Sequence, residues 1–193
     1  MNATVPEFLQ LKPGRVHEAS GPGATSFAAV AAARSGGDVL WVLPGHALGR
    51  LNPQGLSLFF DPARLLLVDA LRHDDALAVA EEALRSGAVA LVVAELSKPL
   101  GLTPGRRLQL AAGAGQATGL CLIPEAMGSN VAETRWLCEP RFGAADSTSM
   151  RWQLNKNKSG TIGAWDVRWN HASRRLDLVS ASGDGPGFAG APG

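Results

Sequence analysis

Residues 16–32, VHEASGPGATSFAAVAA, decide the fold of this chain, because they read as a strand, a glycine turn and a helix. Residues 16–19 have the length of a short strand. Residues 27–33 continue as an alanine-rich helix, with Thr25 or Ser26 near its start. A strand that turns through glycines into a helix is also the arrangement of a phosphate-binding loop, where backbone N–H groups converge on phosphate oxygens.

The loop lacks residues that phosphate chemistry needs. The working spacing is G-x-x-x-x-G-K-[ST], in which the lysine neutralises the terminal phosphates and the hydroxyl holds Mg²⁺. Here Gly21 and Gly23 are too close together to encircle phosphates. Ala24 stands where the lysine should be, and Thr25 stands where the hydroxyl should be. Because residues 16–33 contain no Lys or Arg, these residues alone favour a structural turn over a nucleotide site.

Short apolar runs alternate with helical patterns along the middle of the chain. Runs this apolar are typical of a parallel sheet that helices cover on both faces, and the alternation predicts an α/β fold. The expected strands are residues 39–43, 65–69, 88–94 and 119–123, and the expected helices are residues 74–86 and 103–113.

The pattern changes from residue 149 onward. Residues 150–154, 163–169 and 176–180 alternate apolar and polar side chains and are separated by short polar turns, which predicts an antiparallel meander. The fold class is therefore α/β, with a mainly parallel sheet flanked by helices and a C-terminal antiparallel meander. We divide the chain into an N-terminal arm (1–14), one domain (15–182) and a flexible, glycine-rich tail (183–193).

Composition excludes several classes of function. The chain has 193 residues and a formal net charge of +1, which gives no global reason for binding nucleic acid or a membrane surface. No apolar run approaches the roughly 20 residues that span a bilayer, and no secretory signal is evident, so we expect a cytoplasmic protein. Cys121 lies in an apolar run, and two cysteines without further partners predict neither a disulfide nor a metal site.

In order along the chain, the sequence resembles the ATPase core of the RecA recombinases. Residues 17–32 look like the RecA phosphate loop with several residues removed. Residues 41–50, WVLPGHALGR, look like the segment that carries the catalytic glutamate, but Gly45 falls on that position. Residues 85–97 resemble the strand that ends in a Mg²⁺-associated aspartate, and Glu95 stands there.

The resemblance continues into the second half of the chain. Residues 119–125, GLCLIPE, look like the sensor strand, and residues 154–160, LNKNKSG, keep the family's KNK as Lys156, Asn157 and Lys158. The segments that correspond to the DNA-binding loops are short. The resemblance implies that the lysine and the catalytic carboxylate are lost, and therefore no ATP hydrolysis, no cofactor and no small-molecule substrate.

A shortened RecA core of this kind resembles the ImuA family, and the tryptophan-containing residues 163–179 are similar to that family's C-terminal hairpin. The resemblance implies a non-enzymatic adaptor in the SOS response to DNA damage. It would act in translesion synthesis beside ImuB, an error-prone DnaE-type polymerase and RecA. The alternative is a SulA-like inhibitor of cell division that binds a tubulin-like protein. An NTPase of another kind would need a compensating lysine, and the sequence offers none.

Basic side chains gather in the expected meander, where they could face a partner or DNA phosphates, or simply keep a sheet edge soluble. Both interpretations stay open. The candidates are Arg151, Lys156, Lys158, Arg168, Arg174 and Arg175.

Aromatic residues supply a second set of candidates. Trp165 and Trp169 share one face of a strand, and packing against the sheet is favoured over an interface role for them and for Trp152. Arg135 and Trp136 suit contact with single-stranded DNA, but a buried strand is the favoured interpretation of this segment, so DNA contact is expected to be weak.

The N-terminal arm carries Phe8, Leu9 and Leu11 ahead of the core. Such an arm could mediate self-association or bind RecA. It could also cover the edge of its own sheet, which we favour.

Overall fold

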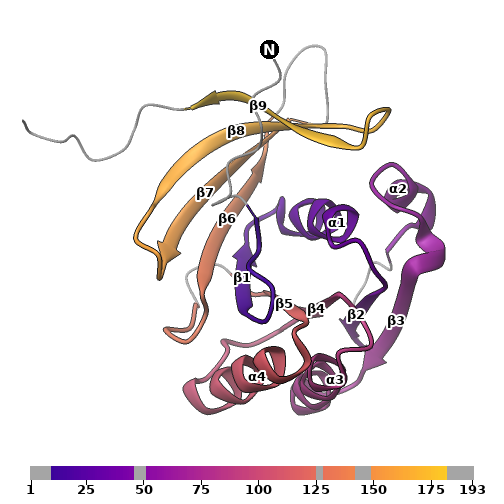
Figure 1. Ribbon diagram of the computed structural model, residues 1–193, viewed down its shortest axis with the longest axis vertical. Coiled ribbons are helices and arrows are strands. Elements are labelled where there is room, and N and C mark those ends of the chain that lie inside the picture. The colour runs from indigo at the N-terminus through magenta and orange to yellow at the C-terminus, as the bar shows by residue number, and fades with distance from the viewer. Residues whose placement is uncertain (1–9, 46–50, 125–127, 142–148, 182–193) are drawn as a thin grey trace, which may run out of the picture.

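The computed structural model describes residues 10–45, 51–124, 128–141 and 149–181, and these form a nine-stranded sheet with helices on both faces (Figure 1). The strand order is β3-β2-β4-β5-β1-β6-β7-β8-β9. The first six strands in this order are parallel, and β7, β8 and β9 continue the sheet as an antiparallel meander. The strands are β1 (Val16–Ser20), β2 (Val39–Pro44), β3 (Leu65–Ala70), β4 (Leu91–Glu95), β5 (Thr118–Leu122), β6 (Thr134–Pro140), β7 (Ser149–Asn157), β8 (Gly163–Asn170) and β9 (Arg175–Ala181).

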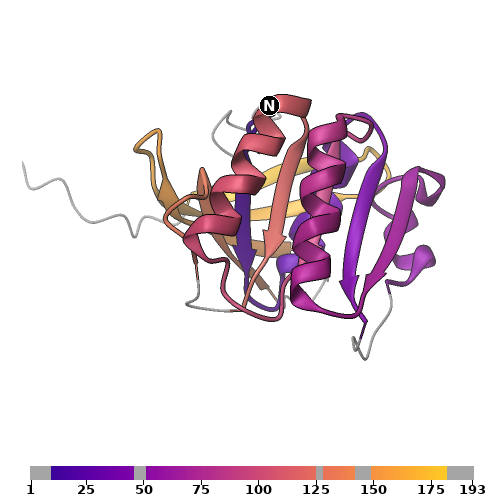
Figure 2. The same cartoon turned by 90° about the horizontal axis from the view of Figure 1, so that it is seen from below.

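The helices lie in two layers. Figure 1 shows α1 and α2 on the face toward which the meander curls, and Figure 2 shows α3 and α4 side by side on the opposite face. The helices are α1 (Ala24–Arg34), α2 (Pro53–Ser57), α3 (His73–Ser86) and α4 (Leu102–Gly115), with a 3-10 turn η2 (Pro62–Arg64). Among the described residues, none of these helices has both the length and the hydropathy needed to cross a bilayer.

The α/β class and the appended meander are confirmed, with shifted boundaries. Helix α1 begins at Ala24, and its N-cap is Gly23, so neither Thr25 nor Ser26 caps it. Strand β4 begins at Leu91 instead of residue 88, because Gly87 ends α3 in the left-handed conformation and residues 88–90 connect the helix to the strand. The expected tail lies outside the described residues.

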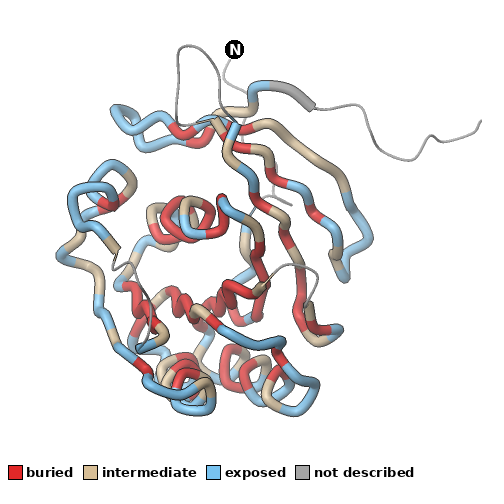
Figure 3. Tube along the Cα trace, turned by 180° about the vertical axis from the view of Figure 1, so that it is seen from behind, coloured by how far each residue is buried: buried red, intermediate tan, exposed pale blue. Residues whose placement is uncertain are grey.

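Two apolar cores sit on the two faces of the sheet. Helices α3 and α4 cover one core, and the other surrounds α1, which is buried on most of its surface (Figure 3). Strand β1 is buried at every position because it lies in the middle of the sheet with side chains facing both cores.

Tryptophans join the meander to the rest of the molecule. The Trp169 Nε1–H donates to the carbonyl oxygen of Leu58 at 2.9 Å, and Phe59 stacks on the Trp169 ring with centroids 5.6 Å apart. Phe27 of α1 contacts the rings of both Trp136 and Trp152. The sheet thus curls around α1, and the expectation that the tryptophans pack in the core is confirmed, with Trp165 only partly buried.

Candidate functional site

The corner between β1 and α1 lies at the carboxyl ends of the parallel strands, where α/β proteins usually bind ligands. Gly21 has a φ of +87°, which a glycine adopts without strain. The Ala24 N–H donates to the Gly21 carbonyl oxygen at 3.0 Å, closing a tight turn. The corner is therefore built as a compact turn from strand to helix.

Strand β6 occupies the space beside this turn. The Gly23 N–H donates to the carbonyl oxygen of Cys138 at 2.8 Å, so one of the N–H groups at the start of α1 is already engaged. A methyl group on Gly21 would lie 2.6 Å from the same oxygen, and one on Gly23 would lie 2.9 Å from the Cys138 carbonyl carbon. Ala24 is buried, and Thr25 points to solvent as an exposed residue.

Gly45, where the resemblance to RecA implies a lost catalytic carboxylate, lies in a crowded environment. The Gly45 N–H donates to the Ala70 carbonyl oxygen at 2.7 Å. A Cβ atom on Gly45 would lie 2.6 Å from Cδ2 of Leu71. A glutamate at this position would therefore require Leu71 to move.

Glu95, at the end of β4, is hydrogen-bonded to a tryptophan. Its Oε1 accepts a hydrogen bond from Nε1 of Trp41 at 2.9 Å. Burial raises the pKa of Glu95, and the Trp41 hydrogen bond offsets part of that rise. The adjoining cavity is about 10 Å³, room for about one water molecule. Among the described residues, no group of three or more His, Cys, Asp or Glu side chains is placed to hold a metal ion.

A buried ion pair connects β1 to β6. The Glu18 carboxylate is completely buried and accepts from Nε of Arg135 at 2.9 Å and from the Ser129 N–H at 2.8 Å. Nη2 of Arg135 also donates to the Ser129 carbonyl oxygen at 2.7 Å. Trp136, the next residue, is completely buried on a strand, as the favoured interpretation of this segment predicts, and its ring is not available to stack on a nucleotide base.

The KNK lysines turn inward onto the segment before β6. The Lys156 ammonium donates to the carbonyl oxygens of Ser129, Asn130 and Ala132 at 3.2, 2.6 and 2.7 Å. Burial, and then the nearby charges of Arg135 and Lys158, lower the pKa of Lys156. Lys158 donates to the Val131 carbonyl oxygen at 2.9 Å. The Lys156 ammonium is therefore engaged within the protein, while Lys158 remains exposed. Contact of either lysine with a partner or DNA phosphates stays a prediction.

The other basic candidates lie on the outer strands. Arg151 is 3.8 Å from Oδ1 of Asp166, and Arg141 is 3.6 Å from the same atom. Arg168, Arg174 and Arg175 are exposed, and the expected cluster is therefore spread along the meander. Leu11 packs partly against the α1 core, while Phe8 and Leu9 lie outside the described residues.

Sequence analysis missed one surface, the free edge of the sheet. Among the described strands β3 pairs only with β2, and Leu66 and Leu67 are 52% and 45% exposed. Leu71, directly after the strand, is 80% exposed. The expectation that the run LLLVD is buried on both faces is wrong, because nothing in its composition distinguishes a central strand from an edge strand.

The fold is also found in a recombinase of known structure. A crystal structure of the RadB recombinase superimposes with a TM-score of 0.65 at 15% identity, covering 88% of this chain and 93% of that chain. At this identity the likeness shows a RecA-like fold and nothing more.

Two curated proteins have similar sequences. Both are named Protein ImuA and come from Caulobacter vibrioides, strains NA1000 / CB15N and ATCC 19089 / CIP 103742 / CB 15. Each is 34% identical over 158 residues, covering 80% of this chain. No protein-family model matches the sequence. The match spans 59% of the length of these relatives. The similarity over these 158 residues supports membership of the ImuA family.

Proposed function

We propose that this chain is a non-enzymatic accessory protein of an ImuA–ImuB mutagenesis system. It acts in the cytoplasm after DNA damage, with an ImuB-like protein, an error-prone DnaE-type polymerase and RecA, during translesion synthesis. The name of the ImuA relatives supports this proposal over the SulA-like alternative. The match spans only 59% of the length of these relatives. The activity and partners of the full-length protein are therefore proposed for this chain.

One observation carries the non-enzymatic part of the proposal. The Cys138 carbonyl oxygen bonds to the Gly23 N–H and lies where a side chain on Gly21 would have to go. Phosphoryl transfer depends on positioned N–H groups and cations around the phosphates. Here one of these N–H groups is engaged within the protein, and the loop supplies no cation.

Calorimetric titration with Mg·ATP tests this part. We expect no heat of binding with micromolar affinity and no phosphate release above the spontaneous rate. Ala24→Lys restores the missing cation but leaves the β6 backbone in place, so we expect this variant to remain inactive as well. A micromolar dissociation constant for the unmodified chain would overturn the proposal.

The adaptor part of the proposal is supported by the free edge of β3. Within the part of the chain that the structure describes, no strand pairs with the outer edge of β3, and Leu66, Leu67 and Leu71 are exposed there. Such an edge can receive an extended segment from another protein. Natural edge strands commonly carry Lys or Pro, and β3 carries neither.

Co-purification with the ImuB-like protein, the DnaE-type polymerase and RecA tests the adaptor part. We expect retention of at least one of them at micromolar concentration, and loss of that retention in Leu67→Lys. Leu110→Lys is the matched control, because Leu110 is also an exposed leucine but lies on α4, away from β3. Failure of the unmodified chain to retain any of the three would contradict the proposal.

A further inference from the structure

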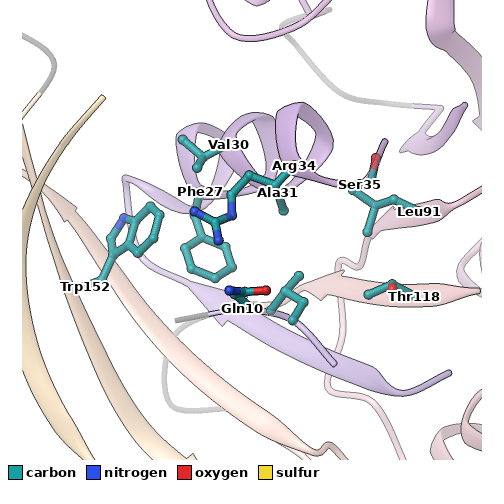
Figure 4. A pocket seen from close by; sticks show the side chains of 10 residues that line it. Gln10, Phe27, Val30, Ala31, Arg34, Ser35, Leu91, Thr118 and Trp152 are labelled. Carbon is teal, nitrogen blue, oxygen red and sulfur yellow. The ribbon is translucent and has the colours of Figure 1, made fainter. Parts of the chain in front are cut away.

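A groove of about 290 Å³ runs along α1, away from the corner that would bind a nucleotide (Figure 4). One wall comes from Phe27, Val30, Ala31, Arg34 and Ser35 of α1. Leu91 and Thr118, the first residues of β4 and β5, lie at its base, so the groove opens at the amino ends of the parallel strands. Trp152 of β7 lies across from the helix, and Gln10 and Leu11 complete the lining.

The lining of the groove is mainly apolar, and among the described residues it includes one cation, Arg34, without a counter-ion. Its walls are mainly Leu11, Phe27, Val30, Leu91 and Trp152. No ion pair or hydrogen bond joins the Arg34 guanidinium to any other residue that the structure describes, and burial lowers the pKa of this group. Nε1 of Trp152 is buried and has no acceptor within the described ranges. The groove therefore suits an extended apolar segment that carries one carboxylate.

We propose that residues 4–9 of the same chain, TVPEFL, occupy this groove, with Phe8 and Leu9 on its apolar walls and the Glu7 carboxylate paired with Arg34. The described chain begins at Gln10, which already lines the groove, so these residues are tethered at its entrance. Glu7 is the one acidic residue in residues 1–9, and Phe8 and Leu9 are bulky apolar residues.

The lengths agree with this arrangement. The groove follows α1 from Phe27 to Ser35, which is about 12 Å at 1.5 Å per helical residue. About four extended residues cover this distance at roughly 3.3 Å each. Pro6 favours an extended backbone at Val5, so the segment enters the groove with little backbone freedom to lose. The arm then covers its own domain, and its apolar residues are not available to a neighbouring molecule.

Cross-linking of two introduced cysteines tests the contact. A paired Glu and Arg hold their Cβ atoms farther apart than the roughly 3.8 Å of a disulfide, so a bismaleimide with a short spacer is used. In Glu7→Cys/Arg34→Cys we expect this reagent to link the two thiols within one chain, while Cys121 and Cys138 stay unreactive because both are buried. The chain is expressed with natural and with ¹⁵N isotopes, the two forms are mixed before the reagent is added, and the linked peptides are identified by mass spectrometry. Linked peptides of a single isotope support the proposal. Peptides of mixed isotope show exchange between chains and overturn it, as does the absence of a link. Glu7→Cys/Arg106→Cys is the control, because Arg106 is exposed on α4, and it should give no link.

Thermal unfolding of Phe8→Asp provides a second, independent measurement. A charge in the apolar groove should lower the midpoint by about 4 °C. Ile162→Asp serves as the control, because Ile162 is an apolar residue already exposed to solvent, and its midpoint should not change. Phe8→Asp with an unchanged midpoint would overturn the proposal.

Discussion

Glu18 shows how one buried charge constrains the centre of the sheet. It lies on β1 directly opposite Arg135 of β6, and it has no contact with solvent. Removing one partner of a buried pair leaves an uncompensated charge, which costs more than the pair contributes. We therefore expect Arg135→Gln to lower the free energy of unfolding by about 3 kcal/mol, measured by urea denaturation.

An exposed arginine provides the comparison for this prediction. Arg141 lies near the Asp166 carboxylate, but it is half exposed, and Arg151 also approaches the same carboxylate. Arg141→Gln should cost about 0.5 kcal/mol. Equal losses in the two variants would show that burial of Glu18 does not control the effect.

His17 predicts a pH dependence of stability. The ring is completely buried between the Thr134 hydroxyl and the Lys12 carbonyl oxygen, and burial lowers its pKa from 6.5 to about 4. The unfolded chain takes up a proton near pH 6.5 that the folded chain does not take up until about pH 4. Stability from this group is therefore complete above pH 6.5 and falls by about 3 kcal/mol as the pH drops to 4.

The measurement is urea unfolding of the unmodified chain and of His17→Gln across pH 4 to 7. Other groups also titrate in this range, so the quantity of interest is the difference between the two proteins. The unmodified chain should lose more stability on acidification than the variant. Parallel pH profiles would show that His17 does not titrate in this way.

The limits of sequence analysis at the residue scale follow from long-range contacts. The types of the candidate residues could be identified, but Lys156 binds carbonyl groups more than 20 residues earlier in the chain. Charge and spacing alone could not distinguish such a lysine from one that faces a partner. Alternation along a strand predicts that Trp169 packs against the sheet, but no local pattern indicates its hydrogen bond to the Leu58 carbonyl oxygen.

At the scale of elements, the turn between β1 and α1 depends on contact with β6. Gly21 has a positive φ, and the Cys138 carbonyl oxygen lies so close to its Cα that a methyl group there would clash with it. Gly21→Ala should therefore lower the free energy of unfolding by about 2 kcal/mol or more, from backbone strain and from displacement of β6. Urea denaturation measures the loss.

Gly36→Ala separates the two causes. Gly36 also has a positive φ, +73°, but no atom lies within 4 Å of a methyl group placed there. It should cost about 1 kcal/mol, from strain alone. If Gly21→Ala and Gly36→Ala lowered the free energy of unfolding equally, the contact between Gly21 and β6 would not contribute to the loss.

Most elements could be predicted because their periodicity is local. The alternating runs of the meander and the apolar runs of the parallel strands are visible in the sequence, and their boundaries move by only a few residues. The order of strands is a different matter. Strand β3 lies at the edge of the sheet and β1 in its centre. These positions depend on the direction of the crossover connections, which a local run such as LLLVD does not indicate.

At the scale of the whole molecule, the parallel and antiparallel halves share one core. Phe27 of α1 contacts Trp136 and Trp152, and Trp169 of β8 bonds to Leu58, next to α2. Unfolding the meander would therefore expose α1, which the parallel strands also need for their own burial. This predicts that the expected domain of residues 15–182 unfolds as one cooperative unit.

Native-state hydrogen exchange, resolved by peptides, measures this cooperativity. Peptides from β2 and β4 and peptides from β7 and β8 should lose protection with the same free energy and the same dependence on denaturant. Fluorescence of Trp41→Phe adds a second probe, because the remaining tryptophans all lie on β6, β7 and β8. Its transition should coincide with loss of far-ultraviolet circular dichroism. An earlier loss of protection in β7 and β8 would mean that the meander is a separate unit, and that the contacts of α1 with Trp136 and Trp152 do not couple the two halves.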